Sequence, residues 1–325
     1  MRKVALSLSM LLIAAPLSAQ ESGYKNLQVL PKDTPRRELG QIMLDNLSGL
    51  GLPRLAGEGC LYCHVGDLET PRADWNYASD AKPMKQKARV MMAMVREIND
   101  KHLAQLEGRL DSDFEVTCAS CHSGRTDPRP LPELLWATYQ EGGIEAAASK
   151  YAELYQRYEG GDAYDFRSNV LPSIAVQLAD SGSIDDAIRL AELNVERHPD
   201  SVSAKQSWVA LSLEKIIDGD GVAKALSELT KLEAQLPAEG RGADLLDALA
   251  WRLNRSERQE AGHALIEANY GKYPDQYRAL ESMAFILSNT ERHAEGVEIL
   301  ERWLEANPDH ARARRLLVNM TAEPK

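Results

Sequence analysis

Two short cysteine motifs carry the residues of this chain that are best suited to chemistry. Residues 60–64 read Cys-Leu-Tyr-Cys-His and residues 118–122 read Cys-Ala-Ser-Cys-His, and together they use all four cysteines. Each is a C-x-x-C-H pentapeptide, the attachment signature of a c-type haem. Two thiols at this spacing can reach the two vinyl-derived carbons on one edge of a porphyrin, and the next histidine lies under the ring, where its imidazole can bind iron. The motifs predict two covalent haems, attached through Cys60, Cys63, Cys118 and Cys121, with His64 and His122 as proximal iron ligands.

Other uses of paired cysteines fit this spacing less well. A four-cysteine zinc site has its C-x-x-C pairs about 15–20 residues apart, whereas 54 residues separate Cys63 from Cys118. A thioredoxin-like redox pair needs a βαβ setting, and helical patterns flank both motifs here. Two plain disulfides are the remaining alternative for a protein outside the cytosol.

The N-terminus has the pattern of an export signal. Residues 1–19 combine a basic start at Arg2 and Lys3, an apolar run over residues 4–15 and a plausible cleavage site before Gln20. The run is too short to span a bilayer, so we expect cleavage, with an uncleaved membrane anchor as the alternative. Export agrees with haem attachment, which takes place outside the cytoplasmic membrane. No later segment is long and apolar enough to cross a membrane, so we expect a soluble periplasmic protein.

Charge and length narrow the function classes. The 325 residues include 38 basic and 49 acidic side chains, for a net charge of -11. An acidic exported protein is a poor candidate for binding nucleic acid or anionic lipid. It could dock on a basic redox partner through a salt-sensitive contact. The length after the signal predicts two domains, and we place a haem domain at residues 20–130 and a second domain at residues 131–325.

The haem domain contains the same unit twice: a helix with methionine, a turn, and then C-x-x-C-H. We expect the first helix to begin with Thr34 as N-cap and to end at Gly49. The second helix is expected to begin near Ser79 and to fade towards Leu106. Such a helix can fold back over the haem and present a thioether sulfur as the second axial ligand.

The two helix-and-motif units differ in the number of methionines that could bind iron. Met43 is the only methionine of the first, whereas the second offers Met84, Met91, Met92 and Met94. Methionine often packs in a core, so most of these four must serve that purpose. His102 is a further candidate, which we expect to lie at the surface.

Several short segments of the domain resemble a known family. They are Gly57–His64, Ala78–Lys82, Ala88-Arg89 with Met91, Met94 with Arg96, Ile98 and Asn99, and Val116–His122 with Gly124. In this order they are similar to one dihaem half of the tetrahaem cytochrome c subunit of photosynthetic reaction centres, over about 110 residues from Asn26 to Pro130. The resemblance implies that Met43 and Met91 are the distal iron ligands. Met91 is favoured over Met94, the fallback, because it follows the Ala-Arg pair.

The chain also departs from that family. One dihaem half is present, the loops before Cys60 and Cys118 are longer, and a different C-terminal domain follows. The resemblance therefore implies a dihaem electron carrier rather than a reaction-centre subunit.

The C-terminal half repeats itself. Pro199, Pro237, Pro274 and Pro308 are spaced by 38, 37 and 34 residues. Small residues precede them by 12 positions, namely Ala187, Ala225, Gly262 and Gly296. Apolar residues precede them by 28 positions and are expected to start the first helix of each pair, namely Leu171, Val209, Leu246 and Leu280. This pattern indicates tetratricopeptide (TPR)-like helix pairs stacked in a solenoid, with a further partial repeat at residues 144–158.

The sequence as a whole predicts an all-α protein in which a dihaem c-type cytochrome domain precedes a TPR-like solenoid. The leading hypothesis is an exported carrier of single electrons, not an enzyme. Its repeats would dock a redox partner, such as a membrane complex, or bind another protein or a peptide. One alternative is a haem-containing scaffold or sensor in which the repeats are primary. Another is a dihaem peroxidase, which would need an open distal site on one iron.

Overall fold

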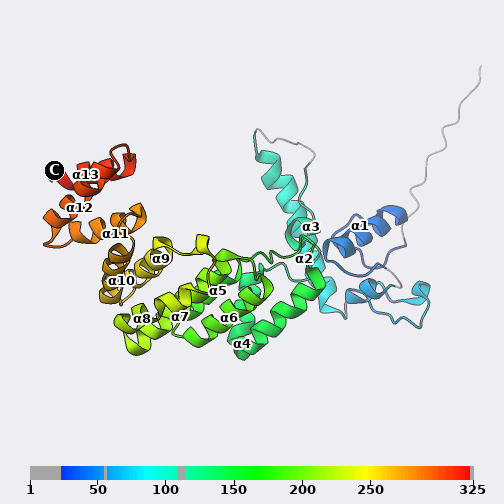
Figure 1. Ribbon diagram of the computed structural model, residues 1–325. Coiled ribbons are helices and arrows are strands. Elements are labelled where there is room, and N and C mark those ends of the chain that lie inside the picture. Colours follow the sequence, from blue (N-terminus) through cyan, green and yellow to red (C-terminus); the bar gives the residue numbers. More distant parts are fainter. Residues whose placement is uncertain (1–22, 55–56, 108–113, 323–325) are drawn as a thin grey trace, which may run out of the picture. The chain divides into compact units, whose positions relative to one another are not determined.

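The computed structural model describes residues 23–54, 57–107 and 114–322, and in these ranges every extended regular element is a helix (Figure 1). The chain divides into two compact units, Met1–Pro128 and Arg129–Lys325. We call them the haem unit and the repeat unit. The expected signal peptide, Met1–Ala19, lies outside the described residues. None of the helices within the described ranges is long and apolar enough to cross a membrane.

The haem unit has little regular structure outside three α-helices. These are α1 (Arg36–Gly49), α2 (Pro83–Glu97) and α3 (Cys118–His122). Short turns of helix lie at Glu58–Tyr62, Arg72–Asp74, Ile98–His102 and Leu103–Gln105. The first motif therefore lies in a 3-10 turn and the second in a short α-helix.

The expected starts of the first two helices are wrong by a few residues. Thr34 does not cap α1, because its hydroxyl donates to the carbonyl of Pro31 at 2.7 Å and the helix begins only at Arg36. The second helix begins at Pro83 rather than near Ser79. Proline excludes the preceding residue from helical geometry, and Lys82 is accordingly extended.

The repeat unit is a succession of helix pairs. Its helices are α4 (Leu131–Tyr158), α5 (Leu171–Asp180), α6 (Ile184–Arg197), α7 (Val202–Asp220), α8 (Val222–Glu233), α9 (Ala243–Asn254), α10 (Gln259–Lys272), α11 (Tyr277–Ser288), α12 (His293–Ala306) and α13 (Ala311–Thr321). Each helix packs on its neighbour in sequence from α4 to α7, and the first helices of successive pairs also meet, as α5 with α7 and α7 with α9. This is the predicted TPR-like stacking.

The partial repeat expected at residues 144–158 is present but has a partner helix that the sequence pattern did not show. Helix α4 is interrupted at Gly143, whose φ of 73° is left-handed. The segment before this glycine supplies the first helix of the pair. Its buried Leu131, Leu134 and Leu135 join the core of the first repeats.

Small residues lie where the paired helices cross, as predicted. Ala187 and Ala225 are fully buried. A Cβ on Gly262 would lie 2.7 Å from both the Ala250 carbonyl oxygen and the Asn254 nitrogen of α9. The helix starts are less regular, because α7 begins at Val202, well before Val209, where the Ser201 hydroxyl accepts a hydrogen bond from Ala204 N at 3.2 Å.

A pair of asparagines ties successive helices together in two of the repeats. Asn194 and Asn269 both lie five residues before a repeat proline and are 1% exposed. Their side-chain amides donate to the carbonyls of Ser168 at 2.9 Å and Ala243 at 3.0 Å, which occupy equivalent places before α5 and at the start of α9. Equivalent positions of the two repeats therefore share a buried hydrogen bond as well as the same pattern of apolar residues.

The close crossing at Gly262 gives a paired test of stability. Gly262→Ala should lower the free energy of unfolding by about 1–2 kcal/mol, because overpacking outweighs the gain in helix propensity. Gly271→Ala, in the same helix, is the matched control, since a Cβ there would meet nothing within 4 Å. It should be neutral or stabilising by up to about 1 kcal/mol. Urea unfolding of the full chain followed by helical circular dichroism measures both, and equal stability of the two variants would contradict the close crossing.

Candidate functional site

The first C-x-x-C-H motif is held in a tight turn. Gly57 has a φ of 86°, and Cys60 N donates to its carbonyl at 2.9 Å. A Cβ on Gly57 would lie 2.8 Å from Arg72 Nε and 2.9 Å from the Trp75 ring, so this position requires glycine for both space and conformation. His64 N donates to the Cys60 carbonyl at 2.9 Å. The turn therefore presents two half-buried thiols and the histidine from one short segment.

His64 is positioned as a neutral imidazole. Its ring meets the Tyr77 ring edge-on at 5.2 Å, and its Nδ1 is buried without a hydrogen-bond partner. Burial lowers the pKa of His64, and the positive charge of Lys85 lowers it further, against an opposing effect of the Tyr77 backbone. Neutral imidazole is the form that binds a metal.

Basic side chains from the start of α2 brace this motif. Lys82 Nζ donates to the carbonyl of Leu61, inside the motif itself. Lys85, 8% exposed, donates to the carbonyls of Tyr77 and Ser79, each at 2.8 Å. Asp80 accepts from Lys85 at 3.2 Å and from Arg89 at 2.9 Å, and the Arg89 bond is the main reason that the pKa of Asp80 lies well below its usual range.

The second motif is α3 itself. Thr117 and Ser120 form a reciprocal capping box at its start, and Ser123 ends it in the left-handed conformation with a φ of 47°. His122 Nδ1–H donates to the carbonyl of Arg125 at 2.8 Å. This bond fixes the ring and leaves Nε2 available for iron. The buried Arg125 side chain in turn donates through Nε to the His122 carbonyl at 3.0 Å.

The C-terminal end of α1 contacts both motifs. Gly49 approaches α3 so closely that a Cβ would lie 2.9 Å from Ala119 N, and its carbonyl accepts from Gly124 N at 2.9 Å. A Cβ on Gly59, the residue directly before the first motif, would meet the buried Leu47 side chain at 3.1 Å. One turn of helix therefore positions both C-x-x-C-H motifs.

Two asparagines support the second motif, and the sequence argument gave them no role. Asn46 accepts from Cys118 Sγ at 3.3 Å and donates to Met92 Sδ at 3.9 Å. Asn99 accepts from Val116 N at 2.8 Å and donates to the Val116 carbonyl at 2.9 Å. The Asn99 amide thus pairs with the extended segment before Cys118 much as a neighbouring backbone would. Asn99 was one of the residues that carry the family resemblance, which is the signal that could have identified it.

The methionines lie on the helices expected to carry them. Met43 is half-buried on α1, and Met91 and Met94 are each 42% exposed on α2. Met92 faces Asn46 instead, which gives it a packing role. His102 is exposed in the turn after α2. The ligation of iron by Met43 and Met91 stays a prediction.

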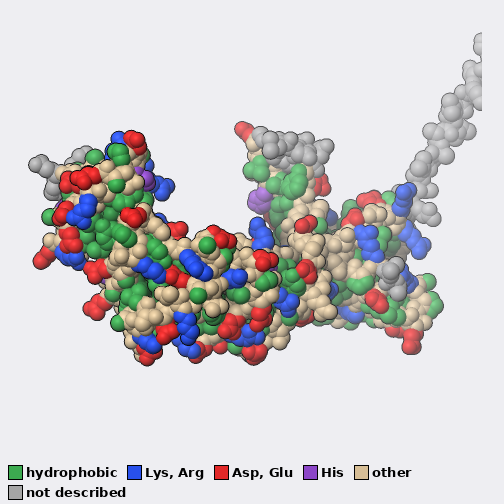
Figure 2. Space-filling model, viewed as in Figure 1, with side chains coloured by type: hydrophobic (Ala, Val, Ile, Leu, Met, Phe, Trp, Pro, Cys, Tyr) green, Lys and Arg blue, Asp and Glu red, His purple; other side chains and the backbone are tan. Residues whose placement is uncertain are grey.

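The apolar surface of the haem unit fits a large ring cofactor. Val90 is 64% exposed beside Met91 and Met94 on α2, and hydrophobic side chains are visible on the surface of the haem unit (Figure 2). In the described part of the unit, Leu47 and Trp75 are the buried apolar side chains, and the other buried apolar side chains lie in the repeat unit. Exposed apolar groups are costly unless something covers them. Four thiols, two imidazoles and this apolar surface make a donor set suited to haem c.

All four cysteine side chains are present as thiols. None of the four cysteines is in a disulfide. Within the described ranges, no three residues among His, Cys, Asp and Glu gather as they would around a bare metal ion. Burial raises the pKa of the Cys63 and Cys118 thiols.

Comparison with known proteins links the motifs to one family. The model of the photosynthetic reaction centre cytochrome C subunit family matches residues 12–212, more than half of the chain. No curated protein matches the chain.

Solved structures of TPR proteins are similar to part of the chain. A thermophilic TPR protein from Thermus thermophilus is 15% identical, with 58% of this chain and 96% of that chain covered and a TM-score of 0.28. A TPR protein from Parabacteroides merdae is 11% identical over 58% and 70% of the two chains, with a TM-score of 0.27. A MamA structure is 16% identical over 55% and 97%, with a TM-score of 0.26. TM-scores this low carry no argument about the fold, so the repeat architecture rests on the helix pairs of this chain.

The Asn99 pairing predicts a defect confined to the second motif. Asn99→Leu removes two hydrogen bonds, each contributing about 1 kcal/mol, and frees the segment before Cys118. We expect less haem attached at the second motif and a haem unit less stable by about 2 kcal/mol. Peptide mass mapping of the two motifs and urea unfolding measure these effects. Gln105→Leu, which replaces another amide at an exposed position outside both motifs, is the control. Equal loss of haem at both motifs in Asn99→Leu would contradict the assignment.

Proposed function

The chain belongs to the photosynthetic reaction centre cytochrome C subunit family, and on that premise we propose that it is an exported dihaem electron carrier with a partner-docking repeat unit. The observation that carries the proposal is the arrangement of both C-x-x-C-H motifs around the end of α1. Each motif offers two thiols and an imidazole in the order that haem attachment requires. We assign residues 20–130 to the haem domain and 131–325 to the repeat domain, after a signal peptide that directs the protein to the periplasm.

The residues of the haem unit have distinct roles in this proposal. Cys60 and Cys63 hold one haem and Cys118 and Cys121 the other, with His64 and His122 as proximal ligands. When bound, haem supplies reversible one-electron exchange at its iron. Met43 and Met91 close the distal positions, which favours electron transfer over reaction with a substrate and raises the reduction potential relative to two histidines.

The close packing around α1 suits an electron carrier. Gly49, Leu47 and Asn46 hold both attachment segments against one rigid turn, so little rearrangement is needed when the charge on an iron changes. A peroxidase would instead need an open distal position with acid or base residues beside it.

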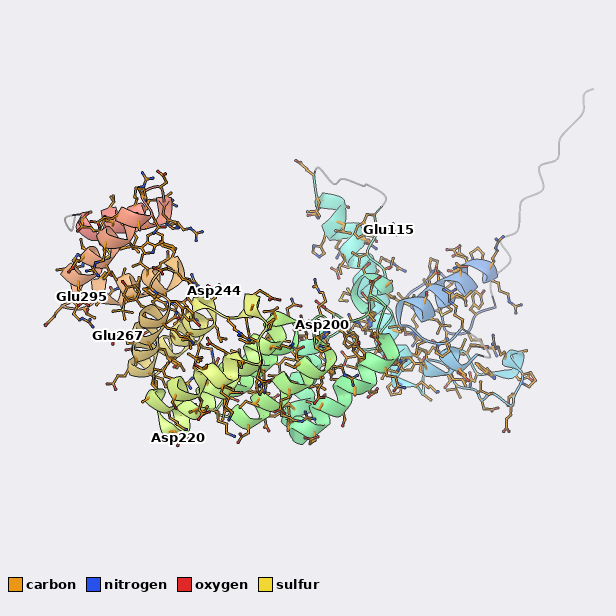
Figure 3. All side chains as sticks on the ribbon, viewed as in Figure 1. Glu115, Asp200, Asp220, Asp244, Glu267 and Glu295 are labelled. Atoms are coloured by element: carbon orange, nitrogen blue, oxygen red, sulfur yellow. The ribbon has the colours of Figure 1, made fainter. Side chains whose placement is uncertain are left out.

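The repeat unit is suited to meet a basic partner. It contains 33 acidic and 22 basic side chains, whereas the haem unit contains 16 of each, so the repeat unit accounts for the whole net charge of -11. Its acidic side chains are spread along the helix pairs, as Asp200, Asp220, Asp244, Glu267 and Glu295 show (Figure 3). The proposed partner is therefore a redox protein with a basic surface, and the docking contact is electrostatic.

Loss of a distal methionine should open one haem to small ligands. The reduced wild-type protein should not bind carbon monoxide, whereas Met43→Ala and Met91→Ala should each make one haem reactive and high-spin, because the sixth position of the iron is vacated. Absorption spectra of the reduced holoprotein with and without carbon monoxide measure this. Met94→Ala is the control, and reactivity in that variant but not in Met91→Ala would reassign the ligand. Reactivity of the wild type would favour an enzyme.

Electron exchange with a basic partner should slow as salt is added. With a lysine-rich c-type cytochrome as the partner, the stopped-flow rate constant should fall at least about tenfold between roughly 10 mM and 500 mM ionic strength, because screening shortens the range of the attraction. The control is an uncharged redox mediator, whose rate should be nearly constant. A salt-independent rate with the basic partner would argue against electrostatic docking.

A further inference from the structure

The two proximal histidines differ in what surrounds them, although their motifs are alike. His122 Nδ1–H donates to the Arg125 carbonyl at 2.8 Å, whereas His64 Nδ1 makes no hydrogen bond of normal geometry, although the Tyr77 backbone lies beside it. Donation from a ligating imidazole makes it a more basic ligand. A more basic ligand stabilises the oxidised iron and lowers its reduction potential. The hydrogen bonds alone therefore make the centre at His122 the easier one to oxidise.

Fixed charge acts in the same direction. Three cations lie around the first motif: Lys82 donates to the Leu61 carbonyl, Lys85 donates to the Tyr77 carbonyl at 2.8 Å, and Arg89 pairs with Asp80 at 2.9 Å. Asp80 pairs with Lys85 and Arg89, so one negative charge faces three positive ones. At the second motif, the cation that the described residues place in contact with His122 is Arg125, whose buried guanidinium donates to the His122 carbonyl. Excess positive charge beside a redox centre stabilises the reduced form, which has one charge less.

Lys85 has a direct structural path to the first centre. Its ammonium group is largely buried, so its charge is weakly screened. It donates to the Tyr77 carbonyl at 2.8 Å, and the Tyr77 ring contacts the His64 ring at 5.2 Å. Lys82 reaches the same motif through the Leu61 carbonyl. Both lysines thus lie against the backbone that surrounds the first proximal ligand.

We propose that Lys82, Lys85 and Arg89 set the centre at His64 as the more oxidising of the two, so that electrons pass from the centre at His122 to the centre at His64. This inference rests on the proposed dihaem function. In each internal step one electron leaves the ferrous iron at His122, which becomes ferric, and reduces the ferric iron at His64. No proton or atom is transferred, and an external redox protein supplies and removes the electron. Lys82, Lys85 and Arg89 do not bind the iron. Their positive charges act through space and raise the reduction potential of the centre at His64.

The test is a redox titration of the holoprotein in which the first centre is labelled. Cys60→Ala leaves that haem with one thioether, which shifts its absorption band and separates it from the second. In this background, Lys85→Met should lower the midpoint potential of the first centre by about 59 mV, a tenfold change in a one-electron equilibrium, and leave the second unchanged. Lys85→Arg keeps the charge and should retain most of the potential. Lys87→Met, an exposed lysine of the same helix, is the matched control and should shift neither centre.

The outcomes separate this inference from the proposed function. Two haems with the second centre more oxidising, or a first centre unmoved by Lys85→Met, would overturn the inference while the electron-carrier function stood. Fewer than two haems in the wild type would defeat the function itself. If Lys85→Met fails to fold, Arg89→Gln with a helical circular dichroism check replaces it, and the same downward shift of the first centre is expected.

Discussion

The haem unit depends on the close approach of the end of α1 to both attachment motifs. Gly49 and Gly124 bring two backbone segments within hydrogen-bonding distance, and neither the space at Gly49 nor that at Gly59 admits a side chain. Leu47, which packs against Gly59, is one of the unit's few buried apolar groups in the described ranges. With so small a core, the relative placement of the motifs depends on backbone contacts.

Polar side chains in and beside α2 hold the backbone of the haem unit together, as apolar packing does in the repeat unit. Lys82, Lys85 and Asn99 each bind backbone carbonyls in or beside a motif. Lys82 and Asn99 belong to the segments that resemble the reaction-centre cytochrome family. The physical role of all three is to hold irregular backbone, because that backbone has no helix or sheet partner of its own.

The sequence predicted the motifs and the repeat helices better than it predicted the hydrogen bonds between distant residues. Cysteine spacing identified the motifs, and the proline and small-residue period located the repeat helices, because these patterns come from local geometry and close crossings. It missed the Asn194 and Asn269 bonds, the Asn99 pairing and the Arg125 carbonyl, because each depends on a proximity that only the folded chain creates. The start of α2 was wrong for a local reason, the restriction that Pro83 imposes on Lys82.

The most direct measurement is the mass of the denatured, intact holoprotein produced with a cytochrome c maturation system. Denaturation removes any haem that is held only by the fold, so the remaining mass counts thioether-bound groups. The account predicts the mass of the mature chain plus two haems, with Cys60–Cys63 and Cys118–Cys121 peptides each carrying one. A mass equal to that of the bare chain, with disulfides or free thiols in both motifs, would contradict it.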